Sequence, residues 1–104
     1  MNISAKIREI QLSESTQKIQ DVKKLFNSIK HLNHDVQFFT FLQIVEQAVC
    51  DNINSIGNIV SIELPSSISL EQAQKHSRSL NLGLIKGGSG TLYLSWCRPL
   101  QEGV

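Results

Sequence analysis

Apolar residues in the first half of the chain recur at helical spacing in two segments. In the earlier segment they are Ile19, Val22, Leu25, Phe26, Ile29 and Leu32. Steps of three residues and one residue place these side chains on one face of an amphipathic helix. In the later segment they are Phe38, Phe41, Leu42, Val45, Ala48 and Val49. These fall within about a third of a helix circumference, so the second helix, which Asp35 can cap through its side-chain oxygen, should carry the main buried stripe.

Residues 3–12 alternate between apolar and polar side chains in two short runs of opposite parity. The apolar members are Ile3, Ala5, Ile7, Ile10 and Leu12. Alternation is typical of a half-buried strand, and a change of parity is typical of a β-bulge. We therefore expect a short bulged strand at the start of the chain.

A further strand and a third helix are expected after the two helices. Gly57 is typical of a helix stop, and the β-branched run that follows it, closed by Pro65, predicts a strand over residues 59–64. Ser69 and Gln72 have the spacing of a capping box. A helix should therefore begin after Ser69 and end near Asn81.

The glycine-rich stretch LGLIKGGSGTLYLSW, residues 82–96, raises the choice between a phosphate-binding loop and a turn. A phosphate-binding loop places its lysine after the glycines and runs into a helix, whereas Lys86 precedes the glycines and a strand-like segment follows them. A β-hairpin is therefore predicted, with residues 88–90 as its loop and Gly90 at positive φ. This odd loop length would turn one set of large apolar residues toward the helices. That set is Leu82, Leu84, Leu92, Leu94 and Trp96.

The expected element order is β-α-α-β-α-β-β, ending in the hairpin. Together these elements predict a single globular domain over residues 1–104, of the α/β (α+β) class. We expect two layers, a small mixed four-stranded sheet and helices covering one of its faces. If residues 3–12 do not form a strand, an αα-β-α-ββ arrangement remains.

Composition narrows the classes of function without selecting one. About 40% of the residues are hydrophobic and the formal net charge is +1, which fits an ordinary globular domain and shows no bias toward a polyanionic partner. The charges are unevenly placed, because no Lys or Arg lies between Lys30 and Lys75. That interval is the expected core.

Neither the cysteines nor the apolar runs indicate a secreted or membrane protein. Cys50 and Cys97 lie far apart without a CxxC pair, so we expect two reduced and unligated thiols. No apolar run has the length of a signal peptide or of a membrane span, which needs about 18 residues. The expected location is the cytoplasm, with no membrane partner.

Candidate catalytic and metal-binding residues are few. His31 and His34 stand beside Asp35, but a third and a fourth ligand at fixed spacing are missing, and a polar helix junction explains the same residues. His76 is predicted at the boundary of the apolar stripe of its helix, with no nucleophile and acidic residue spaced to join it. We therefore expect no metal, no cofactor and no catalytic residue, in a protein that is not an enzyme.

Phe39 and Ile44 fall outside the main stripe of the second helix, on its polar side. Two explanations stand beside each other. Either the helix is sandwiched between two other elements, or these side chains contact another chain, because gathered exposed apolar groups mark interfaces. Phe39 and Ile44 are therefore the candidate partner-binding residues.

The leading functional expectation is a small non-catalytic regulatory or adaptor module. It would act by binding another protein or a second copy of itself. The alternative is a nucleic-acid-binding domain, in which basic residues and one aromatic gather near the C-terminal hairpin. The residues of that alternative site are Lys75, Arg78, Lys86, Tyr93 and Arg98.

Overall fold

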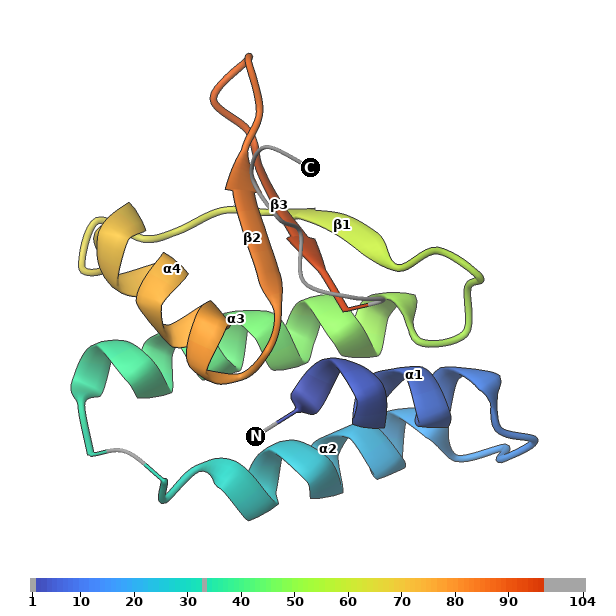
Figure 1. Ribbon diagram of the computed structural model, residues 1–104. Helices are drawn as coiled ribbons and strands as arrows, with labels where there is room; N and C mark the ends of the chain where they lie inside the picture. Colours follow the sequence, from blue (N-terminus) through green and yellow to red (C-terminus); the bar gives the residue numbers. More distant parts are fainter. Residues whose placement is uncertain (1, 33, 97–104) are drawn as a thin grey trace.

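The computed structural model describes residues 2–32 and 34–96. Its helices are α1 (Ile3–Leu12), α2 (Lys18–Ile29), α3 (Val36–Asn52) and α4 (Leu70–Ser79). Its strands are β1 (Ile59–Ile62), β2 (Gly83–Lys86) and β3 (Leu92–Ser95), which form one sheet in the order β1-β3-β2. The domain is mixed α+β, with α1, α2 and α3 on one side of the sheet and the β2–β3 hairpin projecting away from them (Figure 1).

The prediction of a strand over residues 3–12 is wrong, because this segment forms the helix α1. Asn2 caps the helix, with its Oδ1 accepting a hydrogen bond from the Ala5 amide at 3.0 Å. The buried side chains of α1 are Ile3, Ser4, Ile7 and Gln11. Positions i and i+4 share a face in a helix and also share parity in a strand, so Ile3 and Ile7 fitted both patterns. Ala5 distinguishes them, since it lies between these two residues and is exposed.

The expected mixed four-stranded sheet is likewise corrected to a sheet of three strands, all antiparallel. One strand is lost because α1 is helical. The parallel pairing disappears with it, because β3 lies between β1 and β2 and runs opposite to both. From α2 onward the chain follows the alternative order αα-β-α-ββ.

The register of the hairpin confirms the parity argument. Leu84 lies directly opposite Leu94, so the two share a face, and both are buried. The Gly87 amide donates a hydrogen bond to the Thr91 carbonyl at 2.7 Å, which leaves residues 88–90 as the loop. Gly90 has a φ of 87°, in the region that favours glycine.

Gly90→Ala should destabilise the fold by about 1 kcal/mol, because a Cβ strains the backbone at positive φ. Gly88→Ala is the matched control in the same loop. Its added Cβ would meet nothing within 4 Å, and its φ is not in the positive range. Chemical denaturation of both variants checks the prediction. Equal free energies of unfolding for the two variants would contradict this account of the turn.

The predicted helix boundaries that rest on side-chain caps are confirmed. Asp35 Oδ1 accepts a hydrogen bond from the Gln37 amide at 2.8 Å, and Ser69 Oγ accepts one from the Gln72 amide at 3.1 Å. Asn81, with a φ of 63°, ends the turn after α4. No helix in the described part of the chain combines the length and the apolar character needed to cross a bilayer.

The core lies between the inner face of the sheet and the helices. The expected stripe of α3 is buried at Phe38, Phe41, Leu42, Val45 and Val49. Only Ala48 of that stripe is half-buried. The helix α3 contacts α2, α4 and β1, so it is the element around which the other layers pack.

Trp96 follows β3 and is fully buried. Its indole Nε1 donates a hydrogen bond to Gln11 Oε1 at 3.3 Å. The Gln11 Nε2 in turn donates to the carbonyls of Ser55 at 2.8 Å and Gly57 at 2.7 Å. One buried amide therefore joins α1, the loop after α3 and the end of β3.

Candidate protein-binding groove

An open groove runs between α3 and β1, and we call it the α3–β1 groove. Its volume is about 690 Å³. The lining residues from α3 are Thr40, Gln43, Ile44, Gln47, Ala48, Asp51 and Asn52. The lining residues from β1 and the segment after it are Ser61, Ile62, Glu63, Leu64 and Pro65.

Helical periodicity explains how one helix supplies so much of the lining. The contributing positions of α3 are separated by alternating steps of three residues and one residue, which keeps them on one face. Ile44 and Ala48 are half-buried and pack against the core, as does Leu64 on the opposite side. Gln43 and Gln47 are exposed. The groove therefore has an apolar floor and a polar rim.

Among the strands that the structure describes, β1 lies at an edge of the sheet, because only β3 pairs with it. The Trp96 amide donates a hydrogen bond to the Asn58 carbonyl at 3.1 Å, which fixes the phase of the antiparallel ladder. Residues of an antiparallel strand alternate between facing their partner and facing away. Val60 and Ile62 therefore bond to β3, while the amide and carbonyl groups of Ile59 and Ser61 point to the free edge.

The charge of the groove is acidic. Asp51 and Glu63 are exposed members of its lining, and no lysine or arginine is among the described residues that line it. Gln47 Nε2 donates a hydrogen bond to Asp51 Oδ1 at 2.8 Å, which holds this carboxylate along α3. The rim therefore attracts cationic groups, and it does so most strongly at low ionic strength.

The structure separates the two residues that the sequence predicts as partner-binding. Both are half-buried, but Ile44 lines the α3–β1 groove and Phe39 does not. The Phe39 ring lies edge-on to that of Phe38, with 6.4 Å between centroids. Since α3 packs against three elements, it is sandwiched as one interpretation expected, and Ile44 still reaches the groove.

The structure describes four of the five residues of the predicted nucleic-acid site. Lys75 and Arg78 are exposed on α4, and Lys86 is exposed at the end of β2. Lys86 is paired with Leu92, so the neighbouring position Tyr93 lies on the opposite face of the sheet. Arg98 lies outside the described residues.

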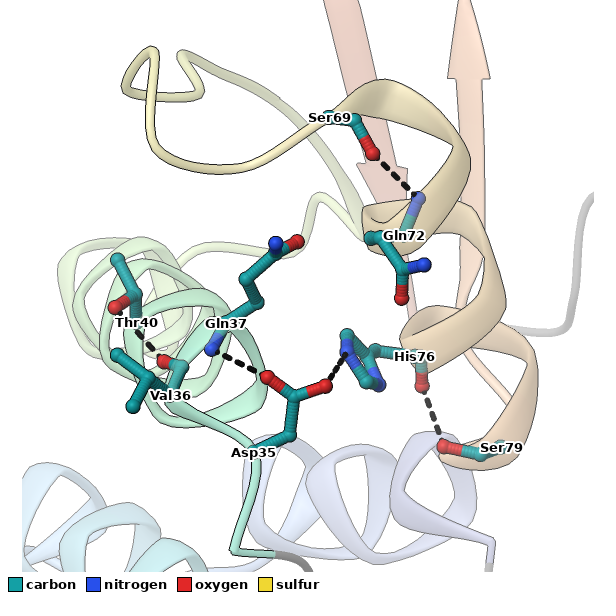
Figure 2. A network of polar contacts seen from close by, with 8 residues as sticks. All are labelled: Asp35, Val36, Gln37, Thr40, Ser69, Gln72, His76 and Ser79. Atoms are coloured by element: carbon teal, nitrogen blue, oxygen red, sulfur yellow. Dashed lines mark hydrogen bonds and ion pairs between the residues drawn. The ribbon is translucent and has the colours of Figure 1, made fainter.

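His76 is buried, with 4% of its surface exposed, and not at a boundary as the sequence predicts. Its ring packs edge-on against Phe38, with 5.2 Å between centroids. Figure 2 shows the imidazole directed from α4 toward Asp35 at the start of α3, with 4.0 Å between Nε2 and Oδ2. A side chain enclosed in this way joins two helices and is not accessible to a substrate.

The histidines and cysteines form no metal centre in the described residues. His31 and His34 are exposed, and no group of three or more His, Cys, Asp or Glu side chains is placed to hold an ion over residues 2–32 and 34–96. Burial and the Glu46 carboxylate raise the pKa of the Cys50 thiol, Lys23 lowers it, and Asp51 raises it by the smallest effect of the four. Cys50 is free, whereas Cys97 lies outside the described residues.

The part that β1 contributes to the groove is not predicted from the sequence. A signal was present, because every lining residue falls in the interval without Lys or Arg between Lys30 and Lys75. The charge pattern by itself indicates only a core. It is core on its buried face, and on its exposed face it is an acidic surface.

Comparison with known proteins identifies no family. No family model matches the chain, and no similar curated protein or solved structure was found. The function is therefore argued from the residues and geometry of this chain.

Proposed function

We propose that this protein is a small non-catalytic regulatory or adaptor module that binds another protein through the α3–β1 groove. The observation that carries the proposal is the half-buried Ile44, in a groove bounded on one side by an edge strand. Apolar burial would supply the binding energy. The unpaired strand edge would supply directional hydrogen bonds.

The form of the groove favours a polypeptide over a small molecule. A small-molecule pocket encloses most of its ligand, whereas this groove is open along its length. Its apolar floor is provided by Ile44, Ala48 and Leu64, and its polar residues lie along the rim. A central apolar patch inside a polar rim is the usual organisation of protein interfaces.

Ile44→Glu should abolish partner binding, because it places a charge on the floor of the groove. The measurement is affinity capture with the immobilised protein, quantified by mass spectrometry against the unaltered protein. Gln43→Arg is a second groove variant, and we expect it to fold because Gln43 is exposed. Val36→Glu is the matched control, since Val36 lies on the same helix, is 76% exposed and is not among the groove residues.

The expected result is a set of bound proteins that both groove variants lose and Val36→Glu retains. Circular dichroism of each variant separates loss of binding from loss of fold. Phe39→Glu, if folded, should behave as the control does. Folded Ile44→Glu and Gln43→Arg proteins that capture the same partners as the unaltered protein would contradict the proposal.

A further inference from the structure

We infer that the α3–β1 groove takes an extended, basic segment of a partner protein, which adds to β1 as a fourth strand of the sheet. The inference rests on the proposed function and specifies the partner class. The occupant is defined by three properties: extended backbone, apolar side chains at alternate positions and lysine or arginine between them.

The extended backbone follows from the free edge of β1. The groups of Ile59 and Ser61 that point away from β3 are donors and acceptors at strand spacing. Between β2 and β3, Gly87 and Thr91 form a hydrogen-bonded pair, so two residues further along the ladder Ile85 and Tyr93 are also hydrogen-bonded. Alternate residues of β3 thus bond to β1 and to β2, and no strand within residues 2–32 and 34–96 pairs with the other edge of β1, where a strand could be added.

The alternation of side chains follows from what lies beside that edge. Successive residues of an added strand would point to opposite faces of the sheet. One set would enter the groove over Ile44 and Leu64, which are half-buried and apolar. The basic character follows from Asp51 and Glu63, which are exposed in a lining without lysine or arginine.

Charge argues against a second copy of the chain in the same place. Two-fold pairing of β1 with β1 would make the interface isologous, so each acidic rim would face the other. Like charges brought together oppose association. A basic segment from a different protein instead neutralises both carboxylates.

The probe is a displayed library of random dodecapeptides, selected on the folded protein at low salt. Selected peptides should carry Lys or Arg alternating with apolar residues. The best one is then synthesised, and its affinity is measured by calorimetry across salt concentrations. We expect the affinity to fall as salt rises, because the acidic rim is exposed.

Two changes test the two parts of the recognition separately. The double variant Asp51→Lys, Glu63→Lys should weaken binding by about tenfold at low salt. Ser61→Pro removes a free-edge donor without touching the bonds of β1 to β3, and it should weaken binding while Ser61→Ala does not. Methylation of alternate amide nitrogens in the peptide should abolish binding with no change to the protein, which covers the case that Ser61→Pro fails to fold.

Failure of the inference can be told from failure of the proposed function. Peptides that need Ile44 but have helical periodicity, or that ignore methylation, salt and charge reversal, would overturn the extended basic occupant and leave the groove as a binding site. A concentration-dependent doubling of solution mass that Ser61→Pro removes would assign the edge to a second copy. Peptides that bind Ile44→Glu equally well, or a selection without binders, would count against both.

Discussion

Trp96→Ala should lower the free energy of unfolding by about 3 to 5 kcal/mol, the largest stability effect expected for this protein. The indole is fully buried at the end of β3. Its removal leaves a cavity between the sheet and α1 and takes away one of the two donors to Gln11 Oε1, the other being the Arg8 guanidinium at 3.4 Å. Such a loss is a large part of the stability of a small domain. Chemical denaturation followed by circular dichroism measures it.

Trp96→Phe is the matched control, because it keeps an aromatic ring in the core and loses the indole N–H. It should cost clearly less than the alanine variant. Exposed Ile56 provides a second control, since it is 97% exposed and Ile56→Ala should change stability by no more than about 0.5 kcal/mol. A Trp96→Ala protein as stable as the unaltered one would show that Trp96 is not part of the core.

Gln11→Leu should cost about 2 kcal/mol, although it places an apolar side chain in a buried position. The substitution leaves the Trp96 indole N–H without its acceptor and removes the donor to the Ser55 and Gly57 carbonyls. A buried group that loses its partner carries a desolvation cost that added apolar contact does not recover. Thermal and chemical unfolding measure the loss.

Gln20→Leu, at an exposed position of α2, is the matched control for Gln11→Leu and should be close to neutral. The pair of Gln11 and Trp96 should also be coupled. In a double-mutant cycle with Trp96→Phe, the combined loss should differ from the sum of the single losses by at least about 0.5 kcal/mol. Strict additivity would contradict the hydrogen bond between the two side chains.

Local signals in the sequence predicted those parts of the fold that depend on nearby residues. Asp35 and Ser69 were identified as caps because a side-chain oxygen satisfies amides two or three residues away. The hairpin followed from the parity of Leu84 and Leu94 together with Gly90. In each of these cases the interaction that decides the structure spans only a few residues or a single turn.

The strand prediction for residues 3–12 is wrong because the strand period and the helix period both fit Ile3 and Ile7. Long-range hydrogen bonds help to stabilise the helix. The Ile3 amide donates to the Leu80 carbonyl at 3.0 Å, and Gln11 Nε2 donates to the Ser55 carbonyl in the loop after α3. No window of sequence around Ile3 contains those partners. The burial of His76 was missed for the same reason, since it depends on Phe38 of another helix.

The sequence predicts one part of the candidate site, which is Ile44 of α3, and does not predict the part contributed by β1. Ile44 was identified because it departs from the stripe of its own helix. The contribution of Ser61 and Glu63 depends on the strand order, in which β1 becomes an edge because β3 lies between it and β2. The strand order depends on which strands pair with one another, and the residues of β1 alone do not determine it.

Amide hydrogen exchange, measured residue by residue with and without the captured partner, tests the central claim most directly. In the free protein the Ser61 amide, which points to the open edge, should exchange faster than that of Ile62, which bonds to β3. Binding in the groove should slow exchange at Ser61 and leave the amides of Lys75 and Arg78 on α4 unchanged. Slowed exchange on α4 and the hairpin, with Ser61 unaffected, would contradict binding through the α3–β1 groove.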